Sequence, residues 1–169
     1  IRALTTWGKL MKVKIPLEIS DYFNFEDFEH YPLVKIPQVF TDFRGTILNL
    51  ADGVLGDVAI ISSKMNSMRA NHVHSHDWHL SYIVSGRMTY LWKELDEPKG
   101  LHEVDINQGE MIFTPPNTPH KMIFHNETIF IAISKMPSSV SRRSLSAKAS
   151  LLPRRKSRNC IPDISLNFL

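Results

Sequence analysis

The stretch RANHVHSHDWH, residues 69–79, holds four of the eight histidines in the chain. Side chains at positions i and i+2 of a β-strand share a face, so a strand here would point His72 and His74 the same way and Val73 the opposite way. Two imidazoles on one face are a suitable pair for chelating an ion, with further ligands supplied by neighbouring strands. The alternatives are a sugar-handling site and a surface cluster that happens to be rich in imidazole.

Short strand-like segments surround this stretch. Each is rich in β-branched or aromatic residues and is bounded by turn residues such as Ser85-Gly86. They span residues 57–63, 79–85, 87–93, 101–106, 110–114, 120–125 and 128–134. Strands of this length and spacing are typical of an antiparallel sandwich or barrel rather than of βαβ units. Residues 18–31 indicate a short helix or a cover over a sheet face.

The length of 169 residues indicates one domain with a sizeable core. No apolar run approaches the roughly 18 residues that would suggest a membrane span. The first twenty residues lack a continuous apolar region of the kind found in secretory signals, and Cys160 is the only cysteine. We therefore expect a cytoplasmic protein without a membrane span.

The net charge of +3 is unevenly distributed. Residues 135–169 contain eight Lys/Arg and one acidic residue, which leaves 12 basic and 16 acidic side chains in the first 134 residues. Basic character therefore belongs to the tail, where no nucleic-acid-binding fold accompanies it. We expect a surface appendage, or a C-terminus altered by a frameshift, and no nucleic-acid partner.

Two motifs in order resemble those of the cupin superfamily. The first carries histidine where glutamate is usual: His72-x-His74-x4-His79-x6-Gly86. The second carries asparagine in place of its second glycine: Gly109-x5-Pro115-x-Asn117-x2-His120. The resemblance covers about residues 40–134 and implies an all-β fold, a single antiparallel double-stranded β-helix or jelly-roll barrel. We expect an N-terminal extension at 1–39 that packs on the barrel, the barrel at 40–134 and the basic tail at 135–169.

The non-histidine motif positions have a structural interpretation of their own. Gly86 and Gly109 fall at hairpin turns, where a positive φ is expected. Pro115 is expected to end a strand and fix the entry of the segment that bears His120.

In the cupins, the first-motif histidines and glutamate together with the second-motif histidine bind a divalent metal inside the barrel. Position by position, the resemblance implies the ligands His72, His74, His79 and His120. Four neutral imidazoles suit Zn, Fe, Ni or Cu better than Mg or Ca. A barrel without an ion is the alternative, and His76 is an alternative to His79. No organic cofactor is indicated.

Two finer resemblances concern nucleotide sugars. Asp42-Phe43-Arg44-Gly45 resembles the D-x-R-G stretch of nucleotide-sugar epimerase cupins. Residues 69–74, RANHVH, are similar to the R-G-x-H-x-H of deoxy-keto-sugar nucleotide isomerases and to the zinc-bearing cupin domains of capsule-sugar reductases. In those families the arginine helps to hold the nucleotide diphosphate, and the histidines act near the sugar ring.

These resemblances assign roles to individual residues. A keto-sugar isomerase needs a base with a pKa near the working pH and a group that stabilises an enolate. Without a metal the base would be His72 or His74, and with one it would be Tyr82 or His76. Arg69, Asn71 and Trp78 are candidate substrate-binding residues. The structural alternatives are an ion pair for Arg69, core packing for Tyr82 and filling of the barrel mouth for Trp78.

The leading hypothesis is an isomerase or epimerase that acts on a nucleotide-linked deoxy-keto sugar in surface-polysaccharide synthesis. The 3,4-ketoisomerase type fits better than the 3,5-epimerase type, because the late strand TIFIAIS lacks the tyrosine acid of the epimerases. The alternatives are a metal-dependent Fe or Ni oxygenase of the same fold and a non-catalytic sugar-binding domain. Since related cupins are often dimers, a homodimer is expected.

Overall fold

The computed structural model describes residues 4–6, 9–11, 30–36, 38–93 and 100–137. Every regular element in these residues is a β-strand, which confirms the all-β prediction for this part of the chain. A helix or cover was predicted at 18–31, and residues 18–29 of that range lie outside the described residues. The tail beyond residue 137 also lies outside them. The strands are β1 (Leu4–Thr6), β2 (Lys9–Met11), β3 (Leu33–Val34), β4 (Gln38–Asp42), β5 (Gly45–Asn49), β6 (Asp57–Ser63), β7 (Met68–His72), β8 (His79–Ser85), β9 (Arg87–Lys93), β10 (Leu101–Asn107), β11 (Met111–Thr114), β12 (His120–Phe124) and β13 (Thr128–Ser134).

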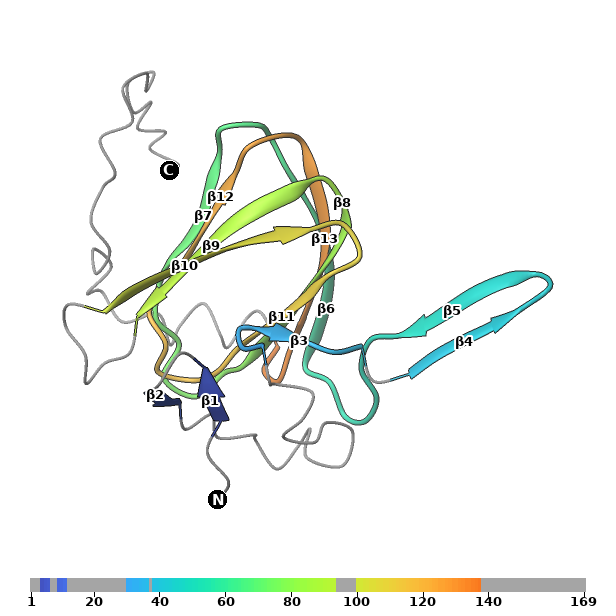
Figure 1. The fold of residues 1–169 in the computed structure, drawn as a ribbon, viewed down its shortest axis with the longest axis horizontal. Coiled ribbons are helices and arrows are strands. Elements are labelled where there is room, and N and C mark those ends of the chain that lie inside the picture. The colour runs from blue at the N-terminus through green and yellow to red at the C-terminus, as the bar shows by residue number, and fades with distance from the viewer. Residues whose placement is uncertain (1–3, 7–8, 12–29, 37, 94–99, 138–169) are drawn as a thin grey trace.

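Two antiparallel sheets form the barrel (Figure 1). One has the strand order β10-β9-β12-β7, and the other has the order β3-β11-β8-β13-β6. Apolar side chains from both sheets meet between them in one buried cluster: Ile83, Met88, Tyr90, Trp92, Ile106, Ile112, Met122, Phe124 and Phe130. Because alternate residues of each strand face this cluster, the jelly-roll barrel expected from the sequence is the observed architecture.

The seven strand-like segments predicted from the sequence are all strands, with ends that differ by no more than one residue. Their turns also behave as predicted: Gly86 has φ +84° and Gly109 has φ +86°. Strand β11 ends at Thr114, directly before Pro115. The strands of the barrel are therefore largely determined by local sequence, because the alternation of apolar and polar residues and the positions of turn residues indicate the same strand ends.

A second apolar cluster covers part of the outer face of the five-stranded sheet. Its buried members are Val34, Trp78, Leu80, Met111, Phe113 and Ile133. Strand β3 pairs with β11 at this side, so residues just before the predicted start of the barrel join its sheet. No helix in the described residues is long and apolar enough to cross a membrane.

Strands β4 and β5 form a hairpin that projects from the barrel (Figure 1). We call residues 38–49 the arm. Its tip is Asp42-Phe43-Arg44-Gly45, where the Asp42 carboxylate accepts hydrogen bonds from the backbone N–H and the guanidinium of Arg44. The D-x-R-G stretch therefore lies at the end of the arm, away from the barrel (Figure 1).

Candidate active site and metal centre

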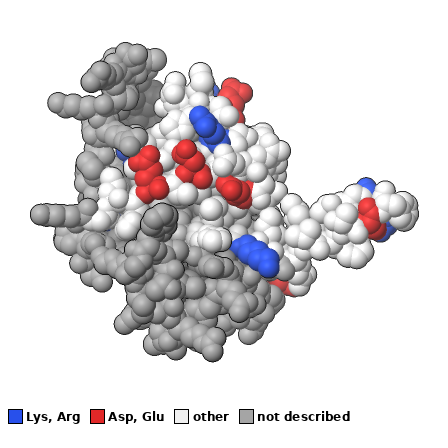
Figure 2. Space-filling model, viewed as in Figure 1, with Lys and Arg blue, Asp and Glu red and all other residues white. Residues whose placement is uncertain are grey.

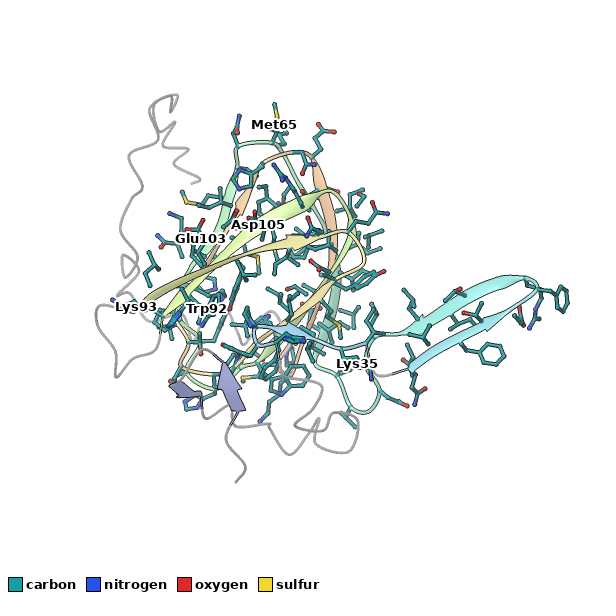
Figure 3. The ribbon with its side chains drawn as sticks, in the orientation of Figure 1. Lys35, Met65, Trp92, Lys93, Glu103 and Asp105 are labelled. Atoms are coloured by element: carbon teal, nitrogen blue, oxygen red, sulfur yellow. The ribbon has the colours of Figure 1, made fainter. Side chains whose placement is uncertain are left out.

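Three histidines converge inside one end of the barrel. His72 ends β7, His120 begins β12, and the two residues pair across these strands. The Nε2 atoms of His72 and His74 are 2.8 Å apart, and the His120 ring lies 5.1 Å from His72 and 5.6 Å from His74 between centroids. His120 also pairs with Trp92, which Figure 3 shows at the end of β9 remote from Met65.

His74 reaches this cluster from a loop and not from a strand. The prediction that His72 and His74 share one strand face is wrong, because β7 ends at His72 and His74 belongs to the irregular segment that follows. The carbonyl oxygen of His74 accepts a hydrogen bond of 2.6 Å from the backbone N–H of Asn117. Asn117 has φ +61°, a conformation that asparagine tolerates better than most residues. The asparagine of the second motif thus keeps the backbone shape of the usual glycine and holds the loop of the first motif.

His120 is fixed by its own turn. Its Nδ1 lies 2.9 Å from the carbonyl oxygen of Thr118, which can only accept, so Nδ1 carries the proton and donates. The lone pair is therefore on Nε2. Such a backbone contact sets the tautomer and orientation that a metal-binding or proton-accepting histidine needs.

A carboxylate stands next to the fourth histidine. Oδ2 of Asp77 lies 3.3 Å from Nε2 of His79, and Oδ1 accepts a hydrogen bond from the backbone N–H of Met136. Asp77 is fully buried. His79 lies beside His74, with ring centroids 4.4 Å apart, whereas His76 is exposed and belongs to neither histidine group described here.

Two groups of metal-ligand type therefore overlap at His74. The first comprises His72, His74 and His120, and the second comprises His74, Asp77 and His79; in each, the potential ligand atoms lie within 4.8 Å of one another. The sequence predicts four imidazole ligands and no carboxylate, and it gives Asp77 no role. The buried carboxylate of the second group is the part of the site that it missed.

Burial keeps the cluster uncharged. It is the main cause that lowers the pKa of His74 to about 4 and that of His120 to about 3, and it also lowers the pKa of His72. Repulsion from the neighbouring histidines lowers all three further. At pH 7 the three rings are neutral, which is the state required of a metal ligand and of a base.

Arg69 faces the same side of its sheet as the histidines because β7 contains a bulge. Arg69 pairs with Met122, and His72 pairs with His120. Between these two pairs β7 advances by three residues, whereas β12 advances by only two. The extra residue lies at Ala70-Asn71, where φ is +61° and +70°. The Arg69 guanidinium donates to the Ser63 hydroxyl and to the Ser62 carbonyl, each at 2.7 Å, so β6 holds it in place.

Two predicted site residues lie elsewhere. On β8, His79 and Ile83 face the interior, whereas Tyr82 packs against the outer-face cluster. Trp78 is 1% exposed in that same outer cluster, against Phe113, and so does not fill the barrel mouth. The geometry removes Tyr82 and Trp78 from the candidate site. Asn71 stays near it as part of the bulge.

Tyr90 lies behind the histidines and was not predicted. It is fully buried, its ring stacks 6.1 Å from that of His120, and its hydroxyl shares a 2.8 Å hydrogen bond with Thr114. Burial raises its pKa, so its hydroxyl stays protonated. The alternation of β9 would have placed Tyr90 in the interior, but nothing in the sequence connects it to His120.

A comparison with models of protein families shows to which family the barrel is similar. The cupin domain model matches residues 64–134. These residues are a cupin domain. The match includes all four histidines of the site and both motifs, while the arm lies before it. No curated protein matches the sequence.

Several solved structures share the fold of this cupin domain. QdtA, a sugar 3,4-ketoisomerase from Thermoanaerobacterium thermosaccharolyticum in complex with TDP, has a TM-score of 0.54 at 13% identity, over 66% of this chain and 87% of QdtA. WlaRB, a TDP-quinovose 3,4-ketoisomerase from Campylobacter jejuni, has a TM-score of 0.53 at 16% identity, over 66% and 85%. The dTDP-4-dehydrorhamnose 3,5-epimerase from Sulfolobus tokodaii has a TM-score of 0.52 at 18% identity, over 63% and 70%. At these identities the likeness shows the fold.

Proposed function

We propose that this cupin is an enzyme that isomerises or epimerises a nucleotide-linked deoxy-keto sugar. The observation that carries the proposal is the group of three neutral imidazoles inside the barrel, with His72 and His74 2.8 Å apart. The fold neighbours support the choice of substrate, because they include ketoisomerases and an epimerase of TDP-linked sugars. Surface-polysaccharide synthesis is the corresponding biological setting.

The chemistry requires a base at a carbon next to a carbonyl. The C–H bond breaks, its proton moves to an imidazole nitrogen, and its electron pair forms an enolate. In an isomerisation a proton then adds to the former carbonyl carbon, and the proton of the adjacent hydroxyl passes to the former carbonyl oxygen. In an epimerisation a proton adds to the opposite face of the same carbon. We assign the base to His72, which is only half-buried and hence within reach of a ligand. An imidazolium formed there keeps its hydrogen bond to His74.

Arg69 is the proposed contact for the diphosphate. A guanidinium has five N–H donors, and β6 engages Nε and one hydrogen of Nη2. The donors that remain suit a phosphate oxygen. Because β6 already orients the guanidinium group of Arg69, little side-chain entropy is lost when a ligand binds.

The donor set fits a divalent transition metal. His120 presents Nε2 with its other nitrogen fixed, and the three cluster histidines are neutral at pH 7. An ion would be held by His72, His74 and His120, or by the group that contains Asp77, and would polarise a carbonyl oxygen. In the first case His72 and His74 cannot serve as the base, and Tyr82 cannot replace them because it faces the outer cluster.

The test is turnover of TDP-4-keto-6-deoxyglucose, followed by proton NMR in D₂O. We expect deuterium to enter at the carbon next to the carbonyl, and His72→Asn to lower the rate at least 100-fold. His125→Asn, a change at an exposed histidine outside the cluster, is the control. Binding without exchange would instead identify a non-catalytic sugar-binding domain, and neither binding nor turnover with TDP-, UDP- or GDP-linked keto sugars would refute the proposal.

Metal content is measured in parallel on the purified protein, His74→Ala and His125→Ala. One Zn, Fe or Ni per chain that His74→Ala removes and His125→Ala retains would make the cluster a metal centre. Absence of metal from all three proteins would leave His72 and His74 as a metal-free base pair.

A metal-dependent oxygenase is the second candidate. The group formed by His74, Asp77 and His79 favours it, because two histidines and one carboxylate are the ligand set of many non-haem Fe(II) oxygenases. Oxygen uptake that requires added Fe(II) would identify this activity, since isomerisation consumes no oxygen.

A further inference from the structure

A row of ring side chains crosses the four-stranded sheet and begins at the histidine cluster. His72 pairs with His120, and His120 pairs with Trp92. Trp92 in turn pairs with His102 on β10, at the edge of this sheet. Residues paired across antiparallel strands have their side chains on the same face. Because Trp92 belongs to the interior cluster, the row faces the inside of the barrel and extends the candidate site towards β10.

The exposure pattern of β10 agrees with an inward-facing His102. Val104, two positions later, packs against the interior cluster, and residues two positions apart in a strand share a face. Glu103 between them is exposed, as is Asp105. Figure 2 shows acidic side chains on this face of the molecule, at the positions that Figure 3 labels Glu103 and Asp105. The outside of β10 is therefore acidic, and His102 is directed to the interior.

Three aromatic rings hold the indole of Trp92. His102 stacks on it with ring centroids 5.1 Å apart, and Tyr90 stacks on it at 5.5 Å. Tyr31 makes an edge contact with it at 5.9 Å. The side chain is only 6% exposed. Since an indole packed in this way has little freedom to rotate, the direction of its N–H is fixed before any ligand binds.

Two buried nitrogens of this row have no hydrogen-bond partner among the described residues. They are Nε1 of Trp92 and Nε2 of His102. An indole N–H can only donate, so it requires an acceptor. Buried polar groups in proteins are normally paired, because an unpaired one is unfavourable. Both nitrogens belong to the row that contains the histidines, and a ligand of the candidate site would supply the missing partner.

We propose that Trp92 and His102 bind the C2 hydroxyl of the sugar and so select substrates that carry it. The inference rests on the proposed function. A 4-keto-6-deoxyhexose has ring hydroxyls on C2 and C3. An isomerisation between C3 and C4, or an epimerisation at C3 or C5, leaves the C2 hydroxyl unchanged. This group is therefore the hydroxyl available for a contact that serves binding alone.

The chemistry of a hydroxyl matches the two nitrogens. Its oxygen can accept a hydrogen bond from the Trp92 N–H, and its proton can be donated to the imidazole of His102. The placement also matches, because C2 is bonded to the reacting C3 while Trp92 is next to His120 across the strands. Trp92 and His102 are thus binding residues that set specificity, and the base remains His72.

The experiment compares the binding of two TDP sugars to the full chain by titration calorimetry. One is TDP-4-keto-6-deoxyglucose, and the other is its analogue without the C2 oxygen. We expect wild-type protein to bind the first at least about 10-fold more tightly, because the analogue leaves the indole N–H unpaired. Trp92→Phe and His102→Phe keep a ring but lose the nitrogen, and each should reduce this preference at least about threefold.

Trp78→Phe is the matched control. Trp78 is 1% exposed and its Nε1 also lacks a partner among the described residues, but it lies in the outer-face cluster. This variant should keep the full preference. TDP alone has no sugar, so its dissociation constant should be the same in all four proteins, and circular dichroism checks their folding. If Trp92→Phe does not fold, the half-buried His102 still provides the test.

Equal binding of the two sugars by the wild-type protein would overturn the proposal. A preference that both Trp92→Phe and His102→Phe retain would also overturn it, and so would one that Trp78→Phe loses to the same extent. Turnover is measured on the same samples. Selective binding without turnover would refute the proposed enzymatic activity and support the sugar contact, whereas failure to bind either TDP sugar would refute both.

Discussion

Oδ2 of Asp77 lies 3.3 Å from Nε2 of His79, and both side chains lie within the group that includes His74. The aspartate is anchored from its other oxygen by the backbone N–H of Met136. A carboxylate held in this way keeps a negative charge in a fixed position beside the histidine. It therefore connects the loop of the first motif with the end of β13.

Asp77→Asn should weaken metal binding without unfolding the barrel. The amide oxygen can still accept from Met136, but the negative charge next to His79 is lost. We expect a 10- to 100-fold rise in the dissociation constant for Zn²⁺, measured by competition with a chelating dye. Asp105→Asn, which changes a carboxylate on β10 that accepts from Thr89, is the control. An unchanged dissociation constant in Asp77→Asn would show that Asp77 does not support the ion.

The metal-free protein should lose stability as the pH falls below about 6.5. The pKa of His74 is about 4 and that of His120 is about 3 in the folded chain, both below the value of an unfolded histidine. The unfolded state therefore binds more protons in this range, and the free energy of unfolding falls by up to about 1.4 kcal/mol per pH unit for each histidine.

Urea unfolding in the presence of a chelator, repeated between pH 7 and pH 4, measures this slope. His120→Asn should reduce it, whereas His76→Asn, which changes an exposed residue outside the cluster, should leave it unchanged. An equal slope in His120→Asn would mean that the buried ring is not its source.

Gly86→Ala should destabilise the barrel more than Gly109→Ala. Both glycines have positive φ, which costs an alanine about 1–2 kcal/mol. A Cβ at Gly86 would also lie 2.4 Å from the carbonyl oxygen of Glu127, whereas nothing lies within 4 Å at Gly109. Denaturant unfolding compares the two variants, and equal losses would contradict the steric argument.

Ala70→Gly should raise the melting temperature. Ala70 has φ +61°, a strained conformation for a residue with a Cβ, and glycine relieves about 1 kcal/mol there. For a chain of this length the gain corresponds to about 2–4 °C by calorimetry. Ala59→Gly in the regular strand β6 serves as a control that should lower the melting temperature. A lower melting temperature for Ala70→Gly would show that the bulge is not strained.

The barrel was largely predictable because alternation and turn residues agree along each of its strands. The arm was not, since apolar residues on both faces of a hairpin produce no alternation. The positions of Tyr82 and Trp78 could have been inferred from parity, because each lies an odd number of residues from the inward-facing His79 on or beside β8. The role of Asp77 could not have been inferred in this way, since its contact with His79 depends on the path of a loop.

The bulge in β7 has a consequence for the spacing of the motif. Arg69 and His72 are three positions apart, a spacing that would place them on opposite faces of a regular strand, and the bulge keeps both on one face. The number of residues between them therefore matters as much as their identity. Deleting Asn71 would remove the extra residue and leave Arg69 and His72 two positions apart, a spacing that a regular strand also places on one face, so the cation and the histidines would stay on the same side without the bulge.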